Sequence, residues 1–206
     1  MPPFPPGHLP GRFPGASSNH RSLELESGSP EQTRRLAMSL SPLLHPGDVV
    51  ALGGDLGAGK TTFVQGLAAG LGIPDRVTSP TFILMREYLG GRYPLIHMDV
   101  YRLERMQEVV DLGYDEFLDP GHIVVVEWGD MVEPLLPKEH LSIHMRYGAA
   151  GDPFGPSRDT VRQISLRPHG ALWEKRMQTA QVLVEGVVSP SPGPDDGPDH
   201  PRGEGR

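Results

Sequence analysis

Apolar residues along this chain change their spacing several times, from that of a helix to that of a strand. Leucines recur at helical spacing from Leu36 to Leu44, and the pair Ser29-Pro30 before them is typical of a helix start. Two short runs, Val49 to Leu52 and Ile123 to Val126, are continuously apolar, which predicts strands that are covered on both faces. A second helix is expected from Thr61 to Leu71, where apolar side chains again follow a helical spacing.

The rest of the pattern continues this alternation of strands and helices. Further strands are predicted at Ser22 to Leu25, Thr81 to Tyr88, Tyr93 to Val100, His140 to Tyr147 and Thr160 to Leu166, and further helices at Leu103 to Leu112 and Ala171 to Leu183. The last two strands alternate apolar and polar residues, so each is expected to have one face in water. Alternating strands and helices predict a three-layer α/β domain with a mixed, mostly parallel sheet.

Composition divides the chain into one domain and two tails. The 26 glycines and 23 prolines among 206 residues crowd the two ends, which carry few large apolar side chains. We therefore expect a disordered leader over residues 1–20 and a disordered tail over residues 185–206. The intervening residues 21–184 fit a single domain of ordinary size.

Charge and residue usage exclude several classes of function. A formal net charge of -7 argues against a protein that grips DNA or RNA through its overall field, so any RNA has to be met locally or through partners. The absence of cysteine excludes a disulfide framework and a thiolate nucleophile. No segment of the sequence approaches the roughly 18 apolar residues of a membrane span, and a cytoplasmic protein without a membrane partner is expected.

The segment between the first apolar strand and the following helix has the spacing of a phosphate-binding loop. It reads Gly54-Asp55-Leu56-Gly57-Ala58-Gly59-Lys60-Thr61, which fits the P-loop pattern G-x-x-x-x-G-K-[ST]. Glycines permit a tight turn whose backbone N–H groups face an anion, and the following helix points its positive end at the same anion. Lys60 is expected to reach the β- and γ-phosphates, Thr61 to bind magnesium and Thr62 to bond the α-phosphate.

A magnesium nucleotide site also needs a carboxylate near the end of a neighbouring strand. Glu127 directly follows the apolar run Ile123 to Val126, where a Walker-B acid normally sits, and Asp99 lies at the end of another predicted strand. Either acid taken alone could be a solvated carboxylate at a strand end. Together with the loop they indicate a metal site, although the sequence leaves open which acid touches the metal directly.

Four motifs carry a resemblance to a known family. They are Gly-Asp-Leu-Gly-Ala-Gly-Lys-Thr-Thr-Phe from Gly54, Ser79-Pro80-Thr81-Phe82, His97-Met98-Asp99-Val100-Tyr101-Arg102-Leu103, and Val126-Glu127-Trp128. In this order and spacing the chain resembles the TsaE (YjeE) family of tRNA threonylcarbamoyladenosine biosynthesis ATPases. The resemblance covers about Leu23 to Leu183 and is specific between Gly53 and Asp130.

The resemblance implies a single P-loop NTPase-like domain that binds ATP or ADP with Mg²⁺ and hydrolyses ATP slowly when alone. It also implies partners, namely TsaD- and TsaB-like subunits of the complex that transfers threonylcarbamoyl to adenosine 37 of tRNAs reading codons that begin with A. The tRNA would be met indirectly, through that complex.

The resemblance further implies roles for individual residues. The loop residues bind nucleotide, the catalytic residues are Lys60, Asp99 and Glu127, and the metal is held, directly or through water, by Thr61, Glu127 and Asp99. Thr81 is expected in a segment that responds to the γ-phosphate, and Trp128 near the nucleotide or a partner surface. Arg158 is expected to lie against the nucleotide.

Two other classes of protein, small-molecule kinases and GTP-responsive modules, share the phosphate-binding loop with ATPases. A small-molecule kinase uses the same loop but usually carries an arginine-rich lid, whereas the segment after Glu127 is Trp-Gly-Asp-Met-Val-Glu-Pro. A GTP-responsive module would need an Asn-Lys-x-Asp motif, which the sequence lacks. Because no arginine finger is obvious, we expect a partner to complete the site; Arg86, Arg102 and Arg105 are candidates for partner contacts or an internal finger, or else form surface salt bridges.

Overall fold

The structure, a computed structural model, describes residues 22–103, 120–148 and 161–187. Several expectations fall outside these ranges and are not tested. They are the helix after Leu103, the loop that follows Gly148, Arg105, Arg158 and the disorder of the two ends.

Within the described residues, seven strands form one sheet in the order β1-β7-β6-β2-β5-β4-β3. Their bounds are β1 Leu23–Ser27, β2 Val49–Gly54, β3 Met85–Tyr88, β4 Leu95–Asp99, β5 Ile123–Glu127, β6 His140–Tyr147 and β7 Arg162–His169. The central strands β2, β4 and β5 are buried along their whole length, which confirms that the apolar runs mark strands covered on both faces.

The sheet is mixed, and five of its strands run in one direction. Strand β2 pairs in parallel with β5 and β6, and β4 pairs in parallel with β5. The antiparallel pairs β6–β7 and β1–β7 return β1 to the common direction, whereas β3 runs against β4. Because parallel strands end at the same edge of a sheet, Gly54, Asp99 and Glu127 arrive at one edge, with Asp99 and Glu127 paired across β4 and β5.

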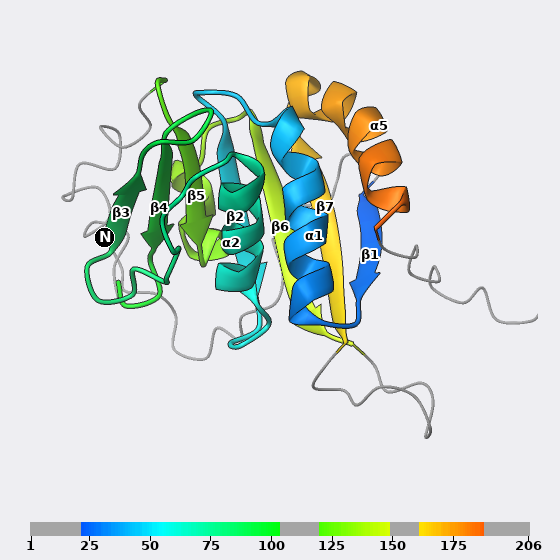
Figure 1. Ribbon diagram of the computed structural model, residues 1–206, viewed down its shortest axis with the longest axis horizontal. Coiled ribbons are helices and arrows are strands. Elements are labelled where there is room, and N and C mark those ends of the chain that lie inside the picture. Colours follow the sequence, from blue (N-terminus) through cyan, green and yellow to red (C-terminus); the bar gives the residue numbers. More distant parts are fainter. Residues whose placement is uncertain (1–21, 104–119, 149–160, 188–206) are drawn as a thin grey trace, which may run out of the picture.

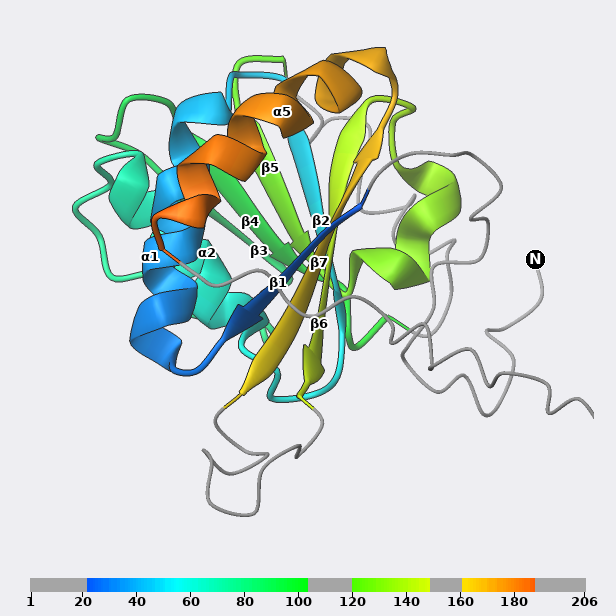
Figure 2. The ribbon, with the colours of Figure 1, turned by 90° about the vertical axis from the view of Figure 1, so that its right-hand side faces the viewer.

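Helices cover one face of this sheet and a shorter helical segment covers part of the other (Figures 1 and 2). On the first face lie α1 (Pro30–Leu40), the 3₁₀ turn η1 (Ser41–Leu43), α2 (Lys60–Gly70) and α5 (Ala171–Glu185). On the second face lies η2 (Gly129–Leu135). The two faces carry separate apolar clusters, one around Phe63 and Leu52 and the other around Val126 and Val132. The three-layer α/β arrangement is therefore confirmed.

Helix α1 starts where the sequence predicts and packs tightly on α2. The Ser29 hydroxyl accepts a hydrogen bond from the backbone N–H of Gln32 at 3.1 Å, as an N-cap side chain should. A side chain at Gly66 of α2 would collide with the backbone of Arg34 and the side chain of Ala37 in α1. The small residue allows the close approach, and it fixes α2, with Lys60 and Thr61 at its start, against the rest of the domain.

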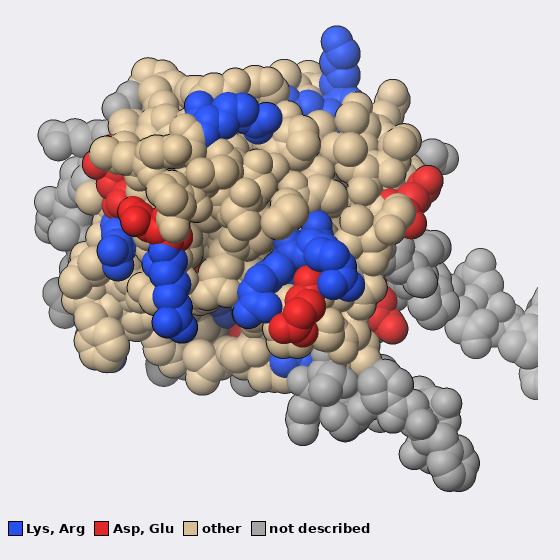
Figure 3. Space-filling model, in the orientation of Figure 1, with Lys and Arg blue, Asp and Glu red and all other residues tan. Residues whose placement is uncertain are grey.

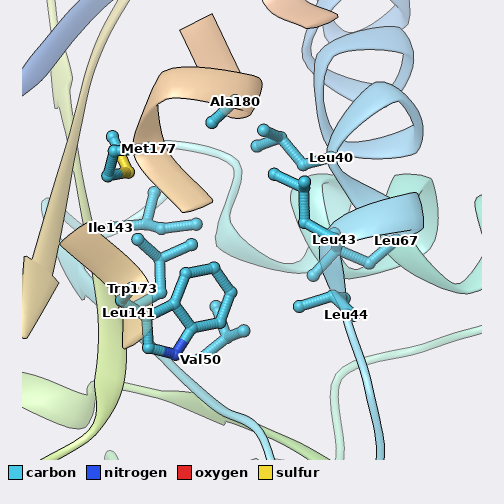
Figure 4. Close-up of a pocket in the computed structure, with 10 residues that line it drawn as sticks. All are labelled: Leu40, Leu43, Leu44, Val50, Leu67, Leu141, Ile143, Trp173, Met177 and Ala180. Atoms are coloured by element: carbon cyan, nitrogen blue, oxygen red, sulfur yellow. The ribbon is translucent and has the colours of Figure 1, made fainter. Parts of the chain in front are cut away.

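Helix α5 closes the apolar layer at the other end of the helix-covered face. Its Trp173 is 1% exposed and packs with residues of α1, η1 and the sheet around a residual cavity of about 10 Å³ (Figure 4). Outside the cluster, Arg176 of α5 pairs with Asp48 at 2.6 Å, just before β2. The predicted final helix is thus confirmed, and it supports the strand that leads into the loop.

One predicted strand starts later than expected. The prediction placed a strand from Thr81 to Tyr88, but β3 begins at Met85. The carbonyl oxygen of Pro80 accepts the N–H groups of Ile83 and Leu84 at 2.9 and 2.7 Å, so the chain turns instead of extending. Leu84 has a φ of 65°, which a branched side chain rarely adopts.

The expected wet face is wrong for β6, although β6 and β7 are both strands. The polar residues His140, Ser142 and His144 of β6 are 5%, 1% and 6% exposed. The strand lies between β2 and β7 rather than at an edge, and its polar groups bond locally, as His140 Nε2 does with Ser142 Oγ at 3.1 Å. The alternation of apolar and polar residues therefore identified the strand correctly. It did not predict that the polar side chains of the strand are buried.

Candidate active site

The loop after β2 turns tightly through glycines with positive φ. Gly54 has a φ of 113°, and a Cβ there would collide with the backbone of Met145 on β6. Gly59 has a φ of 101° and caps the start of α2. These are conformations that favour glycine. The loop is also held from outside, since Asp55 accepts the N–H of Tyr147 at 3.2 Å.

Lys60 lies across the mouth of this loop and is only 4% exposed. Its ammonium donates to the carbonyl oxygens of Gly54 and Asp55 at 3.2 and 2.9 Å and lies 3.6 Å from the centre of the Trp128 ring. Burial lowers the pKa of Lys60, and the negative charges around it, Glu127 foremost, oppose that change. The ammonium is held by neutral carbonyls and a ring, contacts that a phosphate could replace.

Thr61 and Glu127 meet beside the lysine. The Thr61 hydroxyl donates to Glu127 Oε1 at 2.8 Å, and His97 Nε2 lies 2.9 Å from the same oxygen. Glu127 is 4% exposed and ends β5, so its carboxylate is held where the first helical turn of α2 faces the sheet edge. The loop hydroxyl and the acid after the apolar run are therefore in direct contact.

Asp99 organises the segment that precedes β3. One carboxylate oxygen of Asp99 accepts the hydroxyls of Ser79, at 2.7 Å, and of Thr81. The other accepts the backbone N–H of Tyr101 at 3.1 Å. Asp99 is 3% exposed. Its hydrogen bonds connect the turn of residues 79–84 to the end of β4, at the same edge as Glu127.

These groups surround one open cleft of about 410 Å³. The cleft is lined by Leu56, Gly57, Gly59, Lys60, Thr61, Thr62, Ser79, Thr81, Asp99, Tyr101, Glu127 and Trp128. The rings of Tyr101 and Trp128, both among the lining residues, lie 4.7 Å apart at 34° to each other. Trp128 has a φ of 63°, an uncommon backbone state of the kind that functional sites often retain.

The oxygen groups at this edge suit a magnesium ion that keeps some of its waters. They do not suit a metal whose ligands all come from the protein. Thr61, Asp99 and Glu127 offer hydroxyl and carboxylate oxygens, the ligands that hard cations prefer. Among the described residues no three His, Cys, Asp or Glu side chains gather as a ready metal cage. Mg²⁺ commonly keeps several waters and takes ligands from substrate phosphates, so two or three protein oxygens are sufficient.

The structure brings most of the predicted site residues together. Of the loop, Leu56, Gly57, Gly59, Lys60, Thr61 and Thr62 line the cleft, and so do Thr81, Asp99, Glu127 and Trp128. Gly54, Asp55 and Ala58 shape the loop from behind, and Arg158 lies outside the described residues. The roles in nucleotide and metal binding remain predictions.

Two residues behind the loop were missed in the sequence. Arg162 donates from Nε to the Ala58 carbonyl at 3.0 Å and lies 4.3 Å from the ring of Tyr147, whose hydroxyl donates to the Leu56 carbonyl at 3.0 Å. Arg162 also lines a second cavity of about 190 Å³, together with Pro30, Thr33, Thr62 and loop residues. No motif marked either residue, because only the β6–β7 pairing brings Tyr147 opposite Arg162.

Comparison with known proteins agrees with this geometry. A model of the family described as threonylcarbamoyl adenosine biosynthesis protein TsaE matches residues 27–152. The tRNA threonylcarbamoyladenosine biosynthesis protein TsaE of Bacillus subtilis (strain 168) is 46% identical over 132 residues, which cover 64% of this chain and 81% of that protein. The protein of the same name from Streptomyces coelicolor is 41% identical over 154 residues, covering 73% of this chain and 97% of that protein.

A solved structure supports the same relationship. The crystal structure of Bacillus subtilis YdiB matches with a TM-score of 0.67 at 36% sequence identity, over 81% of this chain and 98% of that chain. The mixed α/β fold of P-loop NTPase type is thereby confirmed. The chain belongs to the TsaE family of threonylcarbamoyl adenosine biosynthesis proteins.

Proposed function

We propose that this protein binds ATP with Mg²⁺, hydrolyses it slowly, and thereby supports the formation of threonylcarbamoyladenosine at position 37 of tRNAs that read codons beginning with A. The observation that carries the proposal is the contact of Thr61 with Glu127 beside Lys60, at the mouth of a P-loop. Relatives that share this part of the chain are named for tRNA threonylcarbamoyladenosine biosynthesis, which supports the pathway.

Different residues of the cleft would bind different parts of the magnesium–nucleotide complex. The loop N–H groups and the start of α2 would cradle the phosphates, and Lys60 would exchange its carbonyl contacts for β- and γ-phosphate oxygens. Thr61 and Glu127 would hold the magnesium, directly or through its waters. When bound, the ion neutralises charge that develops on the phosphates during transfer.

We propose that Asp99 assists hydrolysis more than nucleotide binding. It already accepts hydroxyls from Ser79 and Thr81, which line the same cleft. These hydroxyls would lie near the γ-phosphate and the water that attacks it. Phosphoryl transfer depends on how precisely these groups are positioned. We propose that Asp99 orients this segment and the metal's water shell.

We propose that the protein alone turns over ATP slowly. Lys60 is the one cation among the described residues that line the cleft. Arg86 and Arg102 instead lie over the rings of Tyr88 and Phe82, at 5.2 and 4.2 Å. A charge supplied by a partner can raise phosphoryl-transfer rates by orders of magnitude, and TsaD- and TsaB-like subunits are the partners that we propose.

Large apolar side chains at the rim of the cleft are suited to contact such a partner. Leu56, Phe82, Ile83 and Tyr101 are 67%, 82%, 63% and 47% exposed. Leu56 and Tyr101 line the cleft, and Phe82 and Ile83 follow the lining residue Thr81. Exposed apolar groups gathered in this way are typical of interaction sites. A partner seated here would also exclude water from the nucleotide.

Contact with tRNA is proposed to be indirect. On the helix-covered face shown in Figure 3, basic and acidic groups are interspersed among uncharged surface, and the formal net charge of the chain is -7. A net negative charge does not favour binding of a phosphate backbone through the overall field of the protein. Within the described residues, no helix is both long and apolar enough to cross a bilayer. Because the proposed role is in tRNA modification, we propose a cytoplasmic location.

Phosphate release measured with and without partners tests this function. The protein alone should hydrolyse ATP slowly, and addition of the TsaD- and TsaB-like subunits should raise the rate, with Lys60→Ala as the inactive control. Equal rates of hydrolysis with and without the subunits would contradict the proposal that the activity depends on a partner. Transfer of the γ-phosphate to a small hydroxyl compound, without phosphate release, would instead establish the small-molecule kinase.

A further inference from the structure

His97 is a buried histidine that none of the proposed steps uses. It lies on β4, two residues before Asp99, and is 0% exposed. Its Nε2 is 2.9 Å from Glu127 Oε1, the oxygen that also accepts the Thr61 hydroxyl at 2.8 Å. The histidine therefore contacts the same oxygen of the proposed magnesium ligand as the loop hydroxyl does.

The hydrogen-bonding state of His97 follows from its surroundings. Its other ring nitrogen, Nδ1, is buried and has no hydrogen-bond partner among the described residues. An ionised carboxylate can only accept hydrogen bonds. At 2.9 Å from Glu127 Oε1, the Nε2 N–H of His97 is therefore the donor of this contact.

The two contacts fix the orientation of the Glu127 carboxylate. Oε1 accepts both Thr61 Oγ1 and His97 Nε2, while Oε2 accepts neither of them. A carboxylate oxygen has two lone pairs, so these donors occupy Oε1 and direct the second oxygen elsewhere. Partners in this position hold a metal-binding side chain in one orientation, and their loss typically costs 10- to 100-fold in metal affinity.

We propose that His97 is a positioning residue that holds Glu127 in the orientation required for the magnesium–nucleotide complex. The inference rests on the proposed function, because it concerns the same metal. It differs from a packing role in one respect. A residue that only fills the core would affect stability, whereas the donor at Nε2 acts on magnesium affinity.

Magnesium titration at fixed ADP concentration tests the proposal, with Trp128 fluorescence or calorimetry as the readout. In His97→Leu the magnesium concentration at half-saturation should rise about 10- to 100-fold, with ADP affinity in EDTA unchanged. His97→Gln, whose amide can reach where Nε2 lies, should restore most of the affinity. The matched control is His122→Leu, which removes another histidine–glutamate pair, His122 Nε2 with Glu87 Oε1 at 2.8 Å, and should leave the midpoint unchanged.

A comparison of two polar variants guards against misfolding of His97→Leu. The shorter amide of His97→Asn cannot reach Glu127, so it should lose magnesium affinity where His97→Gln keeps it, with thermal unfolding measured for both. Equal magnesium midpoints for the parent and a folded His97→Leu or His97→Asn would overturn the proposal and leave the proposed function intact. Nucleotide binding by the parent that ignores magnesium would overturn both.

Discussion

The hydroxyl of Thr61 and the carboxylate of Glu127 lie 2.8 Å apart, although they are 66 positions apart in the sequence. Thr61 belongs to the first turn of α2 and Glu127 to the last position of β5. Because β5 lies directly beside β2 in the sheet, the strand that leads into the P-loop and the strand that supplies the acid end together. The contact joins a phosphate-binding loop to an acid that could hold its metal.

Loss of the Lys60 ammonium should weaken nucleotide binding while the fold survives. In Lys60→Ala we expect ADP affinity to fall about 10- to 100-fold, the range for a charge-assisted hydrogen bond to a buried partner. Since Lys60 lies 3.6 Å from the Trp128 ring, ADP should also change Trp128 emission in the parent. The signal should persist in Trp173→Phe and disappear in Trp128→Phe. An undiminished ADP affinity in Lys60→Ala would contradict the assigned role of the lysine.

Asp99 should affect stability and hydrolysis more than binding. Asp99→Ala leaves the hydroxyls of Ser79 and Thr81 and the N–H of Tyr101 without their acceptor, so we expect a loss of about 1–3 kcal/mol in unfolding free energy and slower ATP hydrolysis. Asp99→Asn keeps one acceptor oxygen and should recover stability but not rate. Urea unfolding and phosphate release check both effects. A parent-like rate in Asp99→Asn would show that the charge is not needed.

The exposed pair Phe82 and Ile83 should matter only when a partner is present. Replacement of both by serine should reduce stimulation by the transferase subunits about 10-fold or more, because hot spots at interfaces are worth 1–2 kcal/mol or more. ADP affinity and unaided hydrolysis should not change. Leu89→Ser, which alters a residue 59% exposed in the turn after β3, is the matched control. Equal losses in the two proteins would argue against a contact at Phe82.

The stacked pair of His140 and His169, with ring centres 4.0 Å apart, should make stability depend on pH. Burial, and then the charge of His169, lower the pKa of His140 to about 4. The unfolded chain therefore binds more protons between about pH 6.5 and pH 4, and this stability is present above 6.5 and is lost as the pH falls towards 4. Urea unfolding should lose about 2 kcal/mol between pH 7.5 and pH 5 from this group.

His140→Phe provides the control for that pH dependence. Its ring can still stack on His169 but cannot take up a proton, so the loss between the two pH values should shrink by about 2 kcal/mol. If the variant and the parent lose the same amount, the titration of His140 does not account for the effect.

Much of the fold could be predicted because its signals are local. The run Ile123 to Val126 predicts a central strand, and Ser29-Pro30 predicts the start of α1. The loop from Gly54 to Thr61 is recognised by the spacing of its residues. The carboxyl ends of parallel strands meet at one edge of a sheet. The proximity of Asp99 and Glu127 could therefore also be predicted. These inferences need only periodicity, capping and the geometry of parallel sheets.

What could not be predicted depends on long-range pairing. The strand expected from Thr81 begins only at Met85, because Pro80 accepts two backbone N–H groups and turns the chain before it. Tyr147 and Arg162 support the loop only because β6 pairs with β7 in one particular register. The contact of His97 with Glu127 likewise requires β4 to lie beside β5. Strand order and register are properties of the assembled sheet, and they leave little trace in a single sequence.

Reconstituted threonylcarbamoyladenosine synthesis tests the central claim most directly. The yield over many turnovers is measured with the transferase subunits and tRNA, without this protein, with it, and with its variants Lys60→Ala, Asp99→Ala and Glu127→Ala. We predict that the parent protein sustains repeated turnover and that the three variants reduce it to the level reached without the protein. A multi-turnover yield that is the same with the parent, with all three variants and without the protein would contradict the account.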